Sequence, residues 1–434
     1  MKDINTSILE LIETLGQEYK VLKYVYNNNS SFVPGVTPIY YSGPYWDNRE
    51  IVEAIKTLLT GDWLSSGENV RKFETKFARK LNQKSAVMLN SGSSANLVMI
   101  SALKKYLNWN DGDEIILSVV GFPTTLAPII QNNLKPVFVD IEMESLNFDI
   151  NKIRSKITQK TKAIFISPVL GNSPDLDRIL QICSDFDLKV ILDDCDSLGS
   201  EWNNKHLCEY AFCSSHSFYP SHHISTAEGG MVVSNDSEFI KLVRSFSWWG
   251  RDCFCVGAGN LIPHGSCGNR FDKWLDGYDG IIDHKYVFTN IGYNLKPLDM
   301  QGSIGLVQLE KLDEVIEKRI NAKEVIGSLL EKYLDVKVPV ELLKAKTSWF
   351  GVPIICKNKE DKTKLVTYLE NKKIQTRNYF AGNILLHPGY KHLDDYTKYP
   401  EANKVLDQVF FIGCSPHYTN EIFEYIEKCL KEYK

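Results

Sequence analysis

From about residue 85, short apolar segments alternate with helical patterns, and this alternation constrains the fold more than any other feature of the sequence. SAVMLN, DEIILSVV, KPVFVD, KAIFIS and KVILDD are typical of strands, and SSANLVMISALKKYL and SPDLDRILQICSDFD of helices. Apolar strands joined by helical crossovers predict a mostly parallel α/β sheet. Ligands of such sheets lie beyond the carboxyl ends of the strands, so the chemistry is expected in the loops that leave those ends.

Other patterns flank this core. Residues 1–50 predict an N-terminal arm that starts with a helix, and periodicity is lost between Gly250 and Asp283, in a stretch rich in Gly, Asp and Cys. One long helical pattern runs from Leu298 to about Leu334, and an α+β pattern follows it. We expect a large domain over residues 51–320, including the loop 250–283, and a smaller C-terminal α+β domain over residues 321–434.

Composition excludes several classes of protein. The 434 residues are 43% hydrophobic and 24% charged, and the formal net charge of -4 with scattered basic residues gives no sign of a nucleic-acid partner. The longest apolar stretch, Ile115 to Ile130, is broken by glycine and proline, so no membrane span is expected. The first residues lack the apolar core of a signal peptide, which predicts a cytoplasmic protein whose ten cysteines are free thiols or metal ligands.

Two strand ends carry polar motifs. NSGSSANL, residues 90–97, follows a strand and opens a helix, where small residues and the positive helix end favour an anion. A Ser-rich helix cap without a ligand has the same pattern. VILDDCDSLGS, residues 190–200, brings three acids to the same rim. There Asp193 is suited to hold a pyridinium nitrogen protonated, although a solvated acidic turn is the alternative.

A third motif, SFYPSHHISTAEGG at residues 217–230, contains no lysine, and none occurs between Lys205 and Lys241. With DWLSSG (62–67), SGSSA (91–95), Asp193 and GYNLKPLDMQGSIGLVQLEKL (292–312), it resembles the pyridoxal-phosphate sugar aminotransferases of the DegT/StrS type, in the same order along the chain. That resemblance implies the aspartate-aminotransferase-like fold, fold type I of pyridoxal-phosphate enzymes.

The resemblance also implies roles for individual residues. Ser93, Ser94 and Ser217 would contact the cofactor phosphate, Asp193 the ring nitrogen, and Phe122 would stack on the ring. Asn294 would reach the phosphate of a neighbouring subunit, which implies a homodimer.

His222 occupies the position at which the family has its lysine. Imidazole forms no stable imine, so the expected cofactor is pyridoxamine phosphate rather than covalently anchored pyridoxal phosphate. Histidine still serves as a base near neutral pH, and proton removal at the 4′ carbon of the cofactor would expel a sugar hydroxyl. His223 falls one residue late for this role. The change resembles the branch of 4-keto-6-deoxyhexose 3-dehydratases, of which one kind works alone on a GDP-sugar and another works with an iron–sulfur centre on a CDP-sugar.

Cysteines distinguish the two kinds. Cys253, Cys255 and Cys267 lie in the aperiodic loop and Cys195 lies beside the acids of the cofactor pocket. This arrangement resembles the 2Fe-2S motif of the CDP-4-keto-6-deoxy-D-glucose 3-dehydrases, and four thiolates complete such a cluster. Cys208 and Cys213 are alternatives for the fourth ligand, and a zinc site with His264 is the competing interpretation. The chain lacks a dinucleotide-binding fingerprint, so an NADH-dependent flavin and iron–sulfur reductase is the expected partner.

TRNYFAGN, residues 376–383, resembles the segment that these dehydrases use near the nucleotide sugar. Arg377 is a candidate diphosphate contact, with a surface arginine as the alternative, and Asn383 is a second candidate. Trp63, His387 and His417 are further residues of the expected cleft.

The resulting hypothesis is a homodimeric enzyme that removes the C3 hydroxyl of CDP-4-keto-6-deoxy-D-glucose, for 3,6-dideoxysugars of lipopolysaccharide O-antigen. Alternatives are a GDP-4-keto-6-deoxymannose 3-dehydratase, an ordinary nucleotide-sugar aminotransferase, and a non-catalytic cofactor-binding regulator or zinc-stabilised scaffold.

Overall fold

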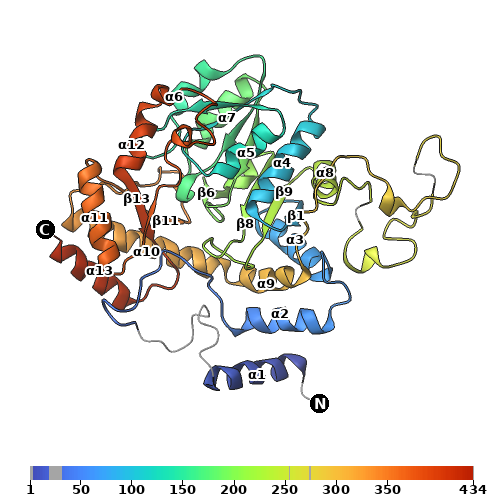
Figure 1. Cartoon of the computed structure of the whole chain (residues 1–434), viewed down its shortest axis with the longest axis horizontal. Coiled ribbons are helices and arrows are strands. Elements are labelled where there is room, and N and C mark those ends of the chain that lie inside the picture. The colour runs from blue at the N-terminus through green and yellow to red at the C-terminus, as the bar shows by residue number, and fades with distance from the viewer. Residues whose placement is uncertain (1–2, 19–31, 254, 273–274, 434) are drawn as a thin grey trace.

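The computed structural model describes residues 3–18, 32–253, 255–272 and 275–433. Its centre is a seven-stranded sheet in the order β1-β9-β8-β5-β4-β2-β3 (Figure 1). Strand β9 pairs antiparallel with β1 and β8, whereas the pairs from β8 through β3 are parallel. The mostly parallel sheet expected from the sequence is therefore confirmed. Its strands are β1 (Ser85–Leu89), β2 (Glu114–Ser118), β3 (Lys135–Val139), β4 (Thr161–Ile166), β5 (Lys189–Asp193), β8 (Cys213–Ser217) and β9 (Gly230–Ser234).

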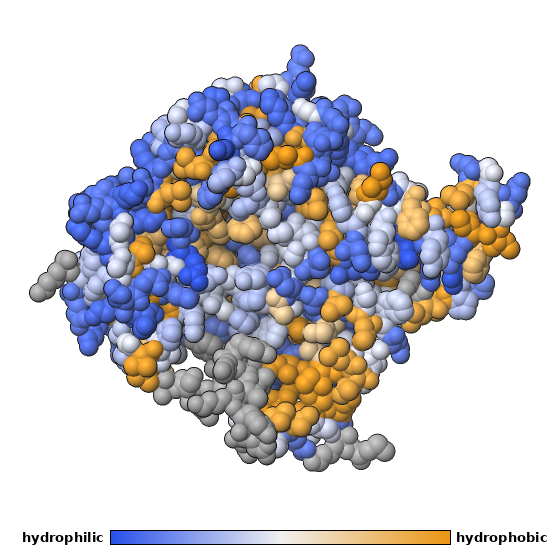
Figure 2. Space-filling view, viewed as in Figure 1, coloured by the Kyte–Doolittle hydropathy of each residue, from blue (hydrophilic) through white to orange (hydrophobic). Residues whose placement is uncertain are grey.

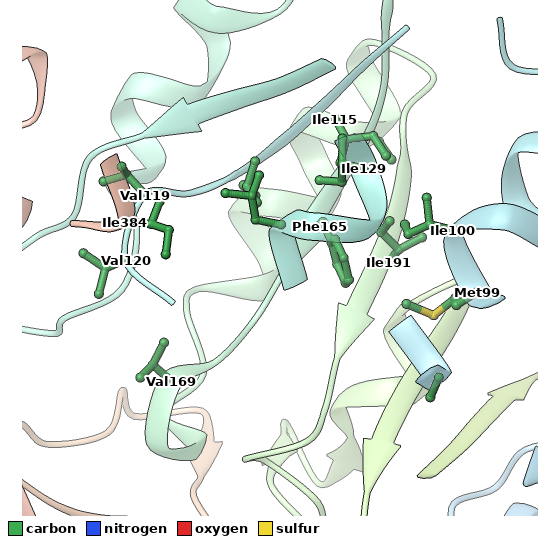
Figure 3. Close-up of a cluster of buried hydrophobic side chains, with 14 of the residues drawn as sticks. Met99, Ile100, Ile115, Val119, Val120, Ile129, Phe165, Val169, Ile191 and Ile384 are labelled. Carbon is green, nitrogen blue, oxygen red and sulfur yellow. The ribbon is translucent and has the colours of Figure 1, made fainter. Parts of the chain in front are cut away.

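Helices cover both faces of this sheet. One apolar core lies under α4 (Gly92–Tyr106), α5 (Pro123–Gln131) and α8 (Ser237–Ser247). Figure 3 shows part of it, with Met99 and Ile100 from α4 and Ile129 from α5 near side chains of the strands. The other lies under α3 (Glu68–Lys80) and α7 (Leu176–Asp185). On β5, Ile191 faces the first core, while Val190 and Leu192 face the second. Burial on both faces explains why the strands are almost continuously apolar in sequence.

A third core lies between the C-terminal helices and a three-stranded antiparallel sheet in the order β11-β13-β12. The first core also extends into this part of the chain through Tyr379, Leu385 and Phe411. The expected boundary at residue 320 falls inside α10, so the division into domains stays a prediction. The elements of this region are α10 (Leu312–Tyr333), β11 (Gly351–Ile355), α11 (Lys359–Asn371), β12 (Thr376–Asn378), α12 (Pro400–Gln408), β13 (Val409–Gly413) and α13 (Asn420–Glu432).

The helical pattern expected as one unit from Leu298 to Leu334 is two helices, α9 (Asp299–Glu310) and α10. They meet at Lys311, whose buried side chain pairs with Glu50 at 2.6 Å and Asp47 at 3.0 Å. This break was not predicted, because apolar residues continue on both sides of Lys311 and neither Gly nor Pro marks the junction.

The N-terminal arm is helical at its start, as expected, and α1 (Ile4–Glu18) packs on α2 (Asn48–Thr60) through Ile8, Ile12 and Val52. Three short strands form the second three-stranded sheet: β6 (Glu201–Trp202), β7 (Lys205–His206) and β10 (Ala345–Lys346). A one-turn helix, α6 (Ile150–Ile153), lies between β3 and β4 in the chain.

Candidate active site

The N-terminus of α4 forms the first wall of the site. Its N-cap is Ser91, whose hydroxyl accepts a hydrogen bond from the backbone N–H of Ser94 at 3.1 Å. The next residue, Gly92, packs so closely on the end of β8 that an added Cβ would lie 2.5 Å from the Cβ of Ser217. This contact brings Ser93, Ser94 and Ser217 to one helix N-terminus, which favours a phosphate group.

A carboxylate on β5 forms the second wall. Asp193 is buried, and its Oδ2 accepts hydrogen bonds from Asn96 Nδ2 at 2.8 Å and Thr125 Oγ1 at 2.6 Å. Its Oδ1 accepts a longer bond of 3.3 Å from the backbone N–H of Cys195. These donors hold the carboxylate in one orientation, as a partner for a ring nitrogen must be held. Thr125 and Asn96 were not among the residues predicted from the sequence.

Aromatic and amide side chains lie farther out. Phe122 precedes α5 by one residue, is 51% exposed, and meets Phe380 edge-on with ring centroids 6.0 Å apart. Asn294 is exposed and accepts a hydrogen bond from Lys296. The exposure of both side chains leaves their predicted contacts, with a cofactor ring and with a neighbouring subunit, as predictions.

His222 lies in the loop between β8 and β9. Its Nδ1 is 3.6 Å from Asp196 Oδ1, and its ring packs on Phe350 with centroids 5.1 Å apart. Burial lowers the pKa of His222 to about 3, and the positive charge of Arg319 adds to this effect. Burial also raises the pKa of Asp196 to about 7, helped by the charge of Asp193. The imidazole is therefore neutral at neutral pH and ready to accept a proton.

His223 has a different environment. It is 1% exposed, and its Nε2 lies 3.3 Å from the carbonyl oxygen of Ser348. Since that ring is enclosed behind the loop, His222 is the histidine placed beside the acids of β5.

These residues fit a pyridoxal-phosphate-type cofactor. The close contact of Gly92 with Ser217 gathers serine hydroxyls at a helix N-terminus, which suits an anion, and the carboxylate of Asp193 is held as a partner for a ring nitrogen. In the loop that follows β8, a histidine occupies the place expected for a covalent anchor.

Comparison with known proteins identifies the family. Residues 46–431 match the DegT/DnrJ/EryC1/StrS aminotransferase family. The chain belongs to this family. Its fold is the aminotransferase-like fold of pyridoxal-phosphate enzymes, as expected, and the chain is an enzyme.

Relatives within the DegT family are similar over nearly the whole chain. The lipopolysaccharide biosynthesis protein RfbH of Salmonella typhimurium is 35% identical over 93% of both chains. The dTDP-4-dehydro-2,6-dideoxy-D-glucose 3-dehydratase of Saccharopolyspora spinosa is 34% identical, over 93% of this chain and 88% of its own. Among solved structures, Escherichia coli GDP-4-keto-6-deoxy-D-mannose-3-dehydratase with bound hydrated PLP is 30% identical, with a TM-score of 0.80, covering 91% of this chain and all of that one.

The four thiols expected to bind a cluster are only partly brought together. Cys253 and Cys255 are hydrogen-bonded to each other, and Cys255 Sγ also accepts from the backbone N–H of Ser266 at 3.2 Å. Burial would raise the pKa of Cys255, but the hydrogen bonds from Ser266, Cys253 and Cys267 outweigh it and lower the pKa. Burial raises the pKa of Cys253 to about 11.

Cys195 contacts Asp193, and its backbone is hydrogen-bonded to His222. Within the described ranges of the chain, no three His, Cys, Asp or Glu side chains converge in a way that could hold a metal. These ranges therefore contain no preformed site for a 2Fe-2S cluster or for zinc with His264, and the ligand set stays a prediction. Cys208 and Cys213 are buried, the latter within β8.

The expected substrate residues are placed differently from one another. Arg377, on β12, is exposed, and its guanidinium lies over the ring of Tyr41 at 4.4 Å. Asn383 is fully buried: its amide donates to Asn403 at 2.7 Å and accepts from the N–H of Leu385 at 3.0 Å. Both polar atoms of the Asn383 side chain are bonded inside the fold, and its role as a substrate contact stays a prediction.

The remaining residues of the expected cleft, Trp63, His387 and His417, have separate surroundings. Trp63 is 40% exposed, His387 bonds the carbonyl of Ala381 at 2.8 Å, and His417 bonds that of Pro44 at 3.2 Å.

None of the helices in the described ranges has both the length and the apolar content to cross a bilayer.

Sequence reasoning missed Asp196 and Arg319 as individual residues of the site. Asp196 was one of three acids noted at the rim, without a role. Arg319 lies in the middle of a helical pattern, and nothing in that pattern signals that its guanidinium reaches the loop of His222.

Proposed function

We propose that this chain is a nucleotide-sugar 3-dehydratase that works with pyridoxamine phosphate and uses His222 as its base. The observation that carries the proposal is the neutral imidazole of His222, 3.6 Å from Asp196, in the loop where the family has its lysine. Relatives named as 3-dehydratases of dTDP- and GDP-sugars support it.

The residues divide the work as follows. The N-terminus of α4 with Ser93, Ser94 and Ser217 binds the phosphate, and Asp193 holds the proton on the ring nitrogen. The cofactor supplies, when bound, the amine that joins the 4-keto group of the sugar and a ring that accepts electrons. His222 takes a proton from the 4′ carbon of the cofactor and delivers a proton to the leaving C3 hydroxyl. Asp196 faces the Nδ1 side of the imidazole at 3.6 Å, and in its ionised form it stabilises the protonated imidazole.

A homodimer is part of this proposal. Asn294 is exposed, as a residue that reaches a neighbouring subunit must be. The surface over α1 and α2 carries an apolar patch, visible in Figure 2, that includes Leu11, Leu58 and Leu59, each more than half exposed. Apolar patches of this kind are typical of surfaces that another chain covers. The cytoplasm stays the expected compartment.

Product analysis tests the proposal. The protein loaded with pyridoxamine phosphate is incubated with the CDP-, dTDP- and GDP-linked 4-keto-6-deoxyhexoses, and the products are identified by mass spectrometry and NMR. We expect loss of the C3 hydroxyl. A 4-amino sugar that keeps its C3 hydroxyl would instead identify an aminotransferase, and no turnover at all would favour a cofactor-binding regulator.

We propose further that the substrate is CDP-4-keto-6-deoxy-D-glucose, and that a 2Fe-2S cluster on Cys195, Cys253, Cys255 and Cys267 receives electrons from an NADH-dependent reductase. The support is the order of the cysteines along the chain and the contact of Cys253 with Cys255. The dehydration described above needs no such centre. The 3,6-dideoxysugars of O-antigen are the expected end products.

Iron and sulfide analysis of anaerobically purified protein tests this second part. We expect iron in the wild type, its loss in Cys253→Ser, and its retention in Cys356→Ser, where another buried thiol is replaced. Wild-type protein that binds no iron would contradict the cluster while leaving the dehydratase proposal standing.

A further inference from the structure

Arg319 is the largest of the fully buried side chains, and it lies directly behind the loop that carries His222. It projects from α10, and its Nη2 donates to the carbonyl oxygens of Ser221 at 3.1 Å and His222 at 3.3 Å. The guanidinium thus holds two consecutive peptide groups of the loop, one of them the peptide of His222 itself.

The same guanidinium holds a second group that contacts the imidazole. Nη1 of Arg319 donates to the carbonyl oxygen of Phe350 at 3.0 Å, and the aromatic ring of Phe350 packs on the ring of His222 with centroids 5.1 Å apart. Arg319 therefore reaches His222 by two routes, through its backbone and through the ring packed beside it.

A residue of the N-terminal arm, Ser42, also contacts Arg319 and the loop. The hydroxyl of Ser42 accepts from Nη2 of Arg319 at 3.2 Å and donates to the carbonyl of Ser221 at 2.7 Å. One side chain thus ties together the arm, the loop after β8 and the segment that leads into β11. These three segments lie far apart in sequence, so their relative position depends on such a link.

Packing alone does not account for a buried arginine. Removing a guanidinium from water is costly, and an apolar side chain of similar volume often stabilises a protein as well or better. The hydrogen bonds of Arg319 described above run to neutral carbonyl and hydroxyl oxygens, so they fix the geometry of those groups rather than neutralise a charge. A planar fork of donors is suited to holding several carbonyls at once.

We propose that Arg319 is a positioning residue for the reaction: its guanidinium fixes the peptides of Ser221 and His222 and so aims the imidazole at the cofactor pocket. The inference rests on the proposed function, in which His222 moves the proton. Arg319 itself is buried behind the loop and acts only through it.

Steady-state kinetics of Arg319→Met and Arg319→Lys in the full chain, with pyridoxamine phosphate in excess to replace the cofactor spent in each turnover, test the inference. We expect Arg319→Met to lower kcat by about 100-fold with KM within about threefold, because a misplaced base slows proton transfer without touching the substrate. Arg319→Lys should recover part of the loss, since an ammonium still donates to one or two of the carbonyls. The matched control is Arg244→Met, which removes a part-buried helical arginine paired with Glu74, away from the loop. It should leave kcat unchanged.

A double variant separates positioning from general structural damage. If Arg319 acts through His222, Arg319→Met should cause little further loss in a His222→Gln background. An equal loss in both backgrounds would overturn the proposal, as would a wild-type kcat in Arg319→Met.

Hydrogen exchange gives a readout that does not depend on activity. In Arg319→Met the amides of residues 218–226 should exchange about tenfold faster or more, while those of β8 and β9 keep their protection. If the methionine variant does not fold, the lysine variant supplies the same comparison at smaller amplitude. Unchanged exchange over residues 218–226 in a folded variant contradicts the inference. Should the wild-type protein carry out no dehydration, the proposed function fails, but the exchange result still decides whether Arg319 holds the loop.

Discussion

The pocket at the strand ends and the loop 250–283 hold their polar groups in different ways. In the pocket, Asp193 takes hydrogen bonds from Asn96 on α4 and Thr125 on α5, so side chains far apart in sequence are fixed by regular elements. In the loop, contacts are mostly local: Arg270 pairs with Asp283, and Ser266 bonds the thiol of Cys255. Helices and strands hold the polar side chains of the pocket in place without a bound ligand. In the loop, the side chain of Cys267 is exposed, and its position is not fixed by packing against the rest of the fold.

The largest expected effect concerns the pocket. His222→Lys places an amine where the neutral imidazole stands, so pyridoxal phosphate should become covalently attached, and dehydration should fall by about 1,000-fold with the loss of the base. Intact-protein mass spectrometry after borohydride reduction measures the attachment, and product analysis the rate.

The control is Tyr219→Lys, in the same loop with a side chain 48% exposed. It should remain unmodified. Undiminished 3-dehydration in His222→Lys would remove His222 from the mechanism.

The second effect tests whether close packing of regular elements builds the phosphate site. Gly92→Ala adds a Cβ 2.5 Å from the Cβ of Ser217, so α4 and β8 must move apart. We expect pyridoxamine phosphate to bind about 10- to 100-fold more weakly, measured by titration with absorbance detection. Gly389→Ala is the control, since an added Cβ there meets nothing within 4 Å. Equal affinities for both variants would mean that the contact does not shape the site.

The third effect is a loss of folding stability at acidic pH. Burial lowers the pKa of His417 to about 3, and the bond to the Pro44 carbonyl only partly opposes this. An unfolded histidine titrates near pH 6.5, so below that pH the unfolded state takes up a proton that the folded state does not. The stability that neutral His417 contributes is complete above pH 6.5. As pH falls from there toward 3, the free energy of unfolding decreases by about 1.4 kcal/mol per pH unit.

Denaturant titrations between pH 8 and pH 4 measure this slope. His417→Gln should reduce the slope by that amount, and replacement of the exposed His392 should not change it. A slope unaffected by His417→Gln would show that this histidine is protonated in the folded protein.

The smallest expected effect belongs to the loop. In the iron-free protein, Cys267→Ser should change the free energy of unfolding by less than about 0.5 kcal/mol and leave cofactor affinity unaltered, because the side chain is exposed. Cys213→Ser, inside β8, should cost about 1–3 kcal/mol, since it buries an additional hydroxyl in an apolar core. Thermal unfolding compares the two. A large loss in Cys267→Ser would show that the loop is as tightly built as the pocket.

The contrast between local and long-range contacts also explains which features could be predicted from the sequence. β5 and α4 were expected within one or two residues of their bounds, since alternating apolar runs and a Ser cap report local structure. The break at Lys311 and the fully buried Asn383 were not foreseen, because both depend on partners far away in sequence, Glu50 and Asn403. In the site, Asp193 and His222 follow from motifs, but Arg319 becomes visible only when three distant segments are placed together.

The most direct test of the central claim, that His222 moves the proton, is loss of label from the 4′ carbon of the cofactor. Protein loaded with pyridoxamine phosphate that carries deuterium on its 4′ carbon is mixed in ordinary water with a nucleotide-linked 4-keto-6-deoxyhexose, and the deuterium left at that carbon is followed by NMR and mass spectrometry. One deuterium should be lost to solvent in the wild type, and its loss should be about 100-fold slower in His222→Gln. Equal rates of loss in the two proteins would contradict the account.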